Sequence, residues 1–122
     1  MGVEDINKPS RQKVHKDKVR NNIFVITGDS CVKCEGFKGD VKMLELHHID
    51  PSIKSFGLSS TIIKSKSWAL VSNEVKKCIP LCPNCHRLFH LERWDYKDLD
   101  FSKLKDYQVE LINNYEHTNN II

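Results

Sequence analysis

The stretch "CIPLCPNCHRLFH" (residues 78–90) predicts an apolar strand joined to a helix through a pair of cysteines. The apolar residues 78–82 predict a short strand, in which Pro80 indicates a sheet edge or a bend. Residues 83–94 begin with a proline, as helices often do, and then repeat apolar residues at helical spacing. The predicted apolar face of this helix consists of Leu88, Leu91 and Trp94.

Two Cys-x-x-Cys pairs account for four of the five cysteines, namely Cys31, Cys34, Cys82 and Cys85. Two intervening residues allow both thiolates of a pair to bind one tetrahedral ion, and two such pairs are typical of a structural zinc (Zn2+) site. A disulfide is disfavoured in a reducing compartment, and a thioredoxin-like redox site would need only one pair. The fifth cysteine, Cys78, is predicted to be a small buried residue and not a ligand.

Two histidine doublets lie close to these cysteines in the sequence. His86 and His90 are four residues apart and share one face of the predicted helix, a spacing suited to binding a metal ion. His47 and His48 lie near the end of the alternating stretch "MLELHHI" (43–49), which predicts a strand. The usual role of a lone histidine is a hydrogen bond in the core or at the surface, and it does not explain two doublets beside metal-binding cysteines. The doublets together indicate a second metal site.

The bulk composition predicts a soluble globular protein. Its 122 residues suit a single domain. Hydrophobic residues make up 39% of the chain and charged residues 29%, which is typical of a globular protein and not of a disordered chain. No apolar run is long enough to span a membrane, and the N-terminal residues lack the apolar segment of a signal peptide. We therefore expect a protein that is not secreted, has no membrane partner, and works in the cytoplasm, the nucleus or the interior of a viral host cell.

The remaining segments predict an α+β fold with helices near both ends. Residues 10–22 predict a basic helix, and the apolar residues 23–27 predict a buried strand. A polar loop is predicted at 51–66, followed by a helix at 67–77. A last helix is predicted at 102–117.

Charge is unevenly distributed along the chain. Residues 1–23 contain six basic and three acidic residues, and residues 54–77 contain five lysines and one glutamate, whereas residues 94–122 are acidic. The two basic segments are either solvated faces or a track that binds phosphate groups. On the second interpretation the partner is DNA, with RNA also open, and the protein is a monomer or a homodimer. The candidate nucleic-acid-binding residues are Lys16, Lys18, Arg20, Lys64, Lys66, Lys77 and Arg87.

The order and spacing of these motifs resemble the HNH (His-Asn-His) endonuclease family in its zinc-stabilised form. The resemblance covers residues 28–93 and is carried by the first cysteine pair, "LELHHIDPS" (44–52), a spacer with "SW", and "VKKCIPLCPNCHRLFH" (75–90). It implies a ββα-metal fold, in which a β-hairpin carries the first histidines and packs on a helix that carries the last. The corresponding parts of the chain are a basic N-terminal arm or helix (1–24), an HNH nuclease domain (25–94) and a C-terminal helical extension (95–122).

The resemblance also implies roles for the histidines. His47, His86 and His90 correspond to ligands of a divalent catalytic ion, and three imidazoles are compatible with Mg2+, Mn2+, Ni2+, Co2+ or Zn2+. His48 corresponds to the general base that activates water for hydrolysis of a phosphodiester bond in DNA. Adjacent strand residues point to opposite sides, so His47 and His48 can serve these two tasks separately.

One position departs from the family pattern, because Lys77 stands where the family has its middle Asn, which ties the hairpin loop to the catalytic strand. Lysine donates hydrogen bonds but cannot accept them, whereas asparagine does both. The sequence therefore leaves open whether Lys77 can hold the hairpin loop against the catalytic strand. A second function is also open, that of a non-catalytic, zinc-stabilised nucleic-acid-binding module. Such a module would use the cysteines and the basic segments, but it would have no need of the four histidines.

Overall fold

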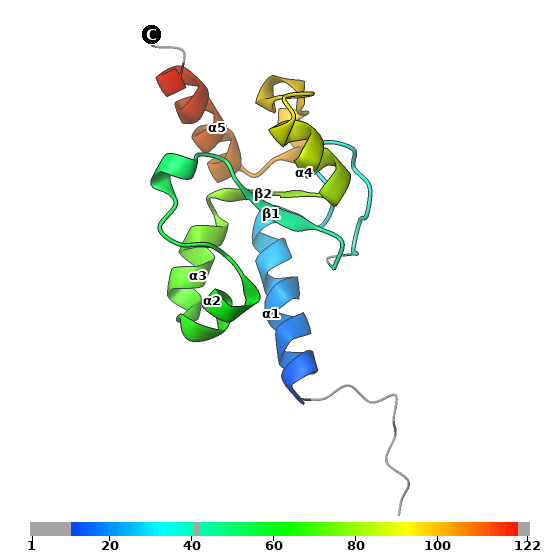
Figure 1. Cartoon of the computed structure of the whole chain (residues 1–122), viewed down its shortest axis with the longest axis vertical. Coiled ribbons are helices and arrows are strands. Elements are labelled where there is room, and N and C mark those ends of the chain that lie inside the picture. Colours follow the sequence, from blue (N-terminus) through cyan, green and yellow to red (C-terminus); the bar gives the residue numbers. More distant parts are fainter. Residues whose placement is uncertain (1–10, 41, 120–122) are drawn as a thin grey trace, which may run out of the picture.

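The computed structural model of the chain describes residues 11–40 and 42–119, without the side chains of residues 11–17, 60 and 117–119. Within these residues the fold is α+β, with five α-helices around one two-stranded sheet (Figure 1). The helices are α1 (Arg11–Thr27), α2 (Ser60–Ser65), α3 (Trp68–Val75), α4 (Pro83–His90) and α5 (Asp106–Asn119). The strands are β1 (Glu45–His48) and β2 (Cys78–Leu81), and short 3-10 turns cover Pro51–Ile53, Tyr96–Asp98 and Phe101–Lys103. None of the described helices is both long and apolar enough to cross a membrane.

The sheet brings the first histidine doublet beside the second cysteine pair. β1 and β2 are antiparallel, with His47 opposite Ile79 and His48 opposite Cys78. The carbonyl oxygen of Pro80 in β2 accepts a hydrogen bond from the backbone amide of Val32 at 3.1 Å. This bond attaches the loop of the first cysteine pair to β2, which leads directly into the second pair. The strands predicted at 43–49 and 78–82 are thus confirmed, and α4 and α1 lie on opposite sides of them (Figure 1).

Residues 23–27 are helical, so the strand predicted at this place was wrong. They form the last turns of α1, which continues across the predicted end of the N-terminal arm. Ile23 and Phe24 are buried while Val25 is 73% exposed, which is not the alternation of a strand. Gly28 ends the helix with a positive φ of 104°, and its amide donates to the Phe24 carbonyl oxygen at 2.9 Å. A short apolar run fits a buried strand or a buried helix equally well, and only packing distinguishes the two.

The rotation of α4 also differs from the prediction. Helix α4 ends at His90, before the predicted end at residue 94. Trp94, beyond this end, is buried as predicted, whereas Leu88 and Leu91 are 42% and 53% exposed. Within α4, Cys85 is buried and Phe89 packs partly against the core, so Leu88 is on the exposed face. The same rotation directs both histidines of α4 toward β1, where their rings meet that of His47.

The other predicted helices are present with small changes. Helix α3 buries Val71 and Val75, and the preceding segment, predicted to be a loop, contains the short helix α2. Helix α5 begins at Asp106, after a separate 3-10 turn. The predicted N-terminal helix is seen from Arg11 onward, and residues 1–10 lie outside the described part of the chain.

The core joins the N-terminal helix, the sheet and the C-terminal helix. Gln108 of α5 is fully buried, and its side-chain nitrogen donates to the carbonyl oxygens of Thr27 and Cys78, each at 3.0 Å. Its side-chain oxygen accepts from the Lys105 amide at 2.8 Å. Cys78 is buried, as predicted, and burial raises the pKa of its thiol to about 12. Side chains from near both ends of the chain therefore contribute to one core.

Candidate metal centres

The four cysteines predicted to bind zinc lie together. The Sγ atoms of Cys31, Cys34, Cys82 and Cys85 all lie within 4.8 Å of one another, and those of Cys34 and Cys82 are 3.9 Å apart. A tetrahedral zinc ion with Zn–S bonds of about 2.3 Å requires sulfur–sulfur distances of about 3.8 Å. The cluster therefore has the size and the donor set for a structural metal ion such as zinc.

Backbone amides surround these sulfur atoms. The amides of Gly36 and Cys85 donate to the Sγ atoms of Cys34 and Cys82, both at 3.4 Å. Burial disfavours a charged Cys31 thiolate, but hydrogen bonds with neighbouring residues outweigh it and lower the pKa of this thiol. Cys82 is also the N-cap of α4, so the helix that carries the second histidine doublet begins at the cysteine cluster.

Three histidines form a second cluster between β1 and α4. One ring nitrogen from each of His47, His86 and His90 lies within 4.8 Å of the others. The first comes from β1, and the other two lie one turn apart on α4. Catalytic metal sites usually have three protein ligands, which leaves a coordination position for water or substrate. The cluster has this number of ligands, whereas the four cysteines form a closed set.

Hydrogen bonds determine which nitrogen of His47 faces the cluster. The Tyr96 hydroxyl donates its only hydrogen to the Ile49 carbonyl oxygen at 2.8 Å, and its oxygen is 2.8 Å from Nε2 of His47. Nε2 of His47 must therefore be the donor, and the lone pair of the neutral ring is on Nδ1. Burial, followed by the neighbouring imidazoles, lowers the pKa of His47 to about 3, which favours the neutral ring that a metal ligand requires.

A carboxylate orients His86 in the same way. Its Nδ1 is 2.8 Å from Oε1 of Glu45, which leaves the lone pair of a neutral His86 ring on Nε2. That atom is 3.3 Å from Nδ1 of His47, so two lone pairs face each other and repel unless they share a cation. Two nitrogens bound to one tetrahedral ion at about 2.0–2.1 Å are about 3.3–3.4 Å apart. His47 and His86 are thus spaced to share a metal ion.

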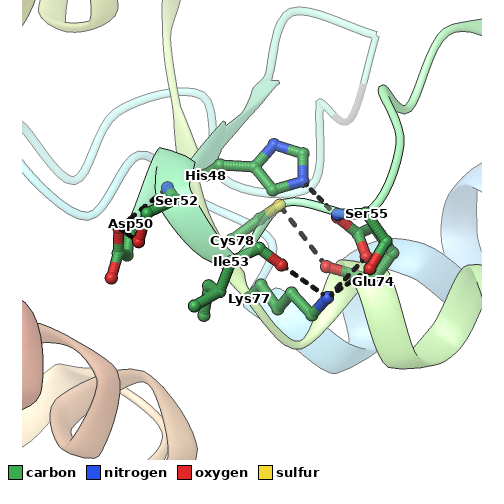
Figure 2. A network of polar contacts seen from close by, with 8 residues as sticks. All are labelled: His48, Asp50, Ser52, Ile53, Ser55, Glu74, Lys77 and Cys78. Atoms are coloured by element: carbon green, nitrogen blue, oxygen red, sulfur yellow. Dashed lines mark hydrogen bonds and ion pairs between the residues drawn. The ribbon is translucent and has the colours of Figure 1, made fainter.

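His48 contacts a buried carboxylate instead (Figure 2). Its Nε2 is 2.9 Å from Oε2 of Glu74, a side chain that is only 2% exposed. Burial opposes the charge on Glu74, but hydrogen bonds from Lys77, Ser55 and His48 outweigh burial and lower the pKa of this carboxyl. An ionised carboxylate can only accept, so Nε2 of His48 donates and the lone pair of its neutral ring is on Nδ1. Burial, partly offset by Glu74, lowers the pKa of His48.

Lys77 ties the segment after β1 to α3 and β2. Its Nζ donates to the Ile53 carbonyl oxygen at 2.9 Å, to Ser55 Oγ at 3.1 Å and to Glu74 Oε1 at 2.8 Å (Figure 2). Its carbonyl oxygen accepts from the Ile49 amide at 2.9 Å. The charge pattern predicts that Lys77 contacts nucleic acid, but the three donors of its ammonium group are directed within the protein.

A pocket of about 710 Å³ is lined by both His48 and His86. Apolar side chains of α1, β1 and α3 line part of it, and one acidic side chain, Glu45, lies among them. Its cationic side chains are Arg20, Lys42, Lys54, Lys64 and Lys66. A pocket with this charge suits a phosphate-bearing ligand.

The pocket contains some of the predicted nucleic-acid-binding residues and not others. Arg20, Lys64 and Lys66 line it, whereas Lys18 and Arg87 are exposed outside it. The side chain of Lys16 lies outside the described residues. Two further cations of the pocket, those at positions 42 and 54, were not among the predicted residues.

Three contacts of the histidines were also missed. Tyr96 falls in the predicted C-terminal extension, and Glu45 is an exposed residue of β1. Glu74 carried a signal, because it is the one acidic residue among the lysines of 54–77 and lies three residues before Lys77. An acid at this helical spacing from a lysine is a common surface pair, so the sequence did not indicate its burial.

No protein-family model, no curated protein and no solved structure matches this chain. The chemistry of the site is therefore inferred from its own side chains. These are a closed cluster of four cysteines, an open cluster of three histidines, and a further histidine on a cationic pocket.

Proposed function

We propose that this chain is a metal-dependent endonuclease of the HNH type that hydrolyses phosphodiester bonds in DNA. The observation that carries the proposal is the pocket shared by His48 and by His86 of the histidine cluster, with five cationic side chains in its lining. A phosphodiester held there would lie beside a candidate base and beside a candidate metal site at once. We further propose that β1, β2 and α4 are the ββα-metal unit, and that the four cysteines hold a structural zinc ion.

The side chains suggest how hydrolysis would proceed. The cations of the pocket attract the DNA backbone. Nδ1 of His48 accepts a proton from a water molecule as the water oxygen attacks phosphorus. The P–O3′ bond breaks, and the 3′ oxygen takes a proton from solvent. A divalent ion held by His47, His86 and His90 (Mg2+, Mn2+, Co2+, Ni2+ or Zn2+) would supply charge neutralisation at the phosphate and at the leaving oxygen.

The alternative is a zinc-stabilised module that binds nucleic acid without cleaving it. The cysteine cluster and the cationic pocket would serve both functions equally. Only an enzyme requires three imidazoles around one position and a fourth imidazole with an available lone pair. The choice between the two functions therefore depends on the histidines, and the experiment must separate their roles.

The experiment incubates the purified chain with supercoiled plasmid and each divalent ion in turn. His48→Ala should lower the cleavage rate by about a hundredfold or more, the usual scale for loss of a general base, with metal affinity nearly unchanged. His47→Ala should weaken metal binding measured by titration calorimetry, and added metal should partly restore its cleavage. If the wild type binds plasmid but cuts none with any ion, the binding module is correct. If only His48→Ala abolishes metal binding, the two histidine roles are reversed.

A further inference from the structure

We propose that Glu74 is a positioning residue for His48 and that Lys77 is the residue that holds Glu74 in place. This inference rests on the proposed function for its effect on cleavage, but its structural part can be tested without activity. Oε2 of Glu74 is 2.9 Å from Nε2 of His48, and Oε1 accepts from Lys77 at 2.8 Å. One carboxylate therefore contacts the candidate base through one oxygen and the ammonium group of Lys77 through the other (Figure 2).

The burial of Glu74 indicates a role beyond a surface ion pair. A buried carboxylate is costly unless hydrogen-bond donors surround it. Here three donors converge on it, because the Ser55 amide also donates to Oε2, at 3.0 Å. Lys77 lies three residues further along the chain, yet the side chain of Glu74 points into the protein at 2% exposure. An acid that only stabilised the helix surface would not need these contacts.

Lys77 extends the network to the backbone after β1. Its ammonium group also binds the Ile53 carbonyl oxygen and the Ser55 hydroxyl. These residues flank Lys54, whose side chain lines the pocket together with His48. An asparagine at position 77 could both donate and accept, whereas lysine only donates. Glu74 supplies the acceptors that lysine lacks, so the two residues together hold the loop and the imidazole.

The consequence for His48 is a defined tautomer. With Nε2 donating to Glu74, the nitrogen that can accept a proton is Nδ1, which points away from Glu74 (Figure 2). A ring without this contact can exchange tautomers and rotate. The proton acceptor would then be misplaced for part of the time. We therefore expect Glu74 to affect the rate of the bound complex more than the binding of substrate.

The test uses the zinc-loaded chain of 122 residues and long-range 15N–1H NMR of the histidine rings. The His48 signals are assigned by their absence in His48→Ala. Wild-type His48 should carry its proton on Nε2. Glu74→Leu removes the acceptor of His48 but leaves the ammonium of Lys77 unpaired and threatens folding, so a second variant combines Glu74→Leu with Lys77→Met and removes both charges together. Glu110→Leu, the same change at an exposed site of α5, is the control.

The double variant should fold, keep its metal affinity and lose the single tautomer of His48. Its kcat on plasmid should fall by about 10- to 100-fold with little change in KM, by analogy with the loss of activity when a metal-binding histidine loses its outer hydrogen-bond partner. A wild-type His48 protonated on Nδ1 would overturn the inference, and so would a folded double variant with wild-type kcat. If the tautomer is as expected but no ion supports cleavage, the positioning role stands and the nuclease proposal fails.

Discussion

Replacing Tyr96 with Phe removes one hydroxyl group that links a candidate metal ligand to the backbone. The phenyl ring can keep the packing of Tyr96, whose ring centroid is 5.0 Å from that of Phe89 and 5.7 Å from that of Tyr115. The lost contacts are the hydrogen bonds to Nε2 of His47 and to the Ile49 carbonyl oxygen, both 2.8 Å long. The variant therefore tests the orientation of His47 with little change in shape.

Two magnitudes follow from these contacts. Removing the outer partner of a metal-binding histidine typically costs about 10- to 100-fold in metal affinity, which is about 1.4 to 2.8 kcal/mol. The carbonyl oxygen of the buried Ile49 loses its partner as well, and an unsatisfied buried acceptor costs about 1–3 kcal/mol of unfolding free energy. Tyr96→Phe should therefore weaken metal binding and also lower stability.

The assay is titration calorimetry of Mn2+, Co2+ or Zn2+ into protein whose cysteine site already holds zinc, beside urea unfolding. Tyr107→Phe is the matched control, because the hydroxyl of Tyr107 in α5 also donates to a backbone carbonyl oxygen, that of Ile26 in α1. Neither residue belongs to the histidine cluster. The control should lose stability but keep its metal affinity. Equal metal affinity in the two variants would refute the assignment of Nδ1 of His47 as a ligand atom.

Three further predictions concern the zinc site, the core and the pocket. Cys34→Ser should release zinc, detected by elemental analysis, and unfold the chain, because metal binding supplies much of the folding free energy of small metal-binding domains; folded wild-type protein without bound metal would contradict this. Gln108→Leu should lower the unfolding free energy by about 2–6 kcal/mol, because it leaves two buried carbonyl oxygens without a donor, at about 1–3 kcal/mol each, whereas exposed Asn113→Ala should change it little. Neutralising Arg20, Lys64 and Lys66 together should weaken DNA binding for all sequences and reduce the slope of log K against log salt by up to about 2.7. An unchanged slope would show that these side chains do not contact phosphate.

Spacing in the sequence predicted the four cysteines and the pair His86 and His90, because local geometry follows from it, whereas the choice of His47 as the third member came from the resemblance to the HNH family. Two residues between cysteines place two thiolates on one ion, and four residues between His86 and His90 place two imidazoles on one helix face. The alternation of residues 43–49 likewise predicted β1, and with it the opposite directions of the two neighbouring histidines. These relations depend on backbone periodicity within a few residues and need no knowledge of the rest of the chain.

The surroundings of those clusters depend on the tertiary structure. Whether residues 23–27 form a strand or a helix depends on what they pack against, because an apolar run suits either. The partners of the histidines come from distant segments: Glu74 is 26 residues from His48, and Tyr96 is 49 residues from His47. Hydrogen bonds between such distant segments form only when the core is assembled, so no local sequence pattern predicts them. Most members of the two clusters can therefore be predicted from the sequence, whereas the tautomers of the histidines are a property of the folded chain.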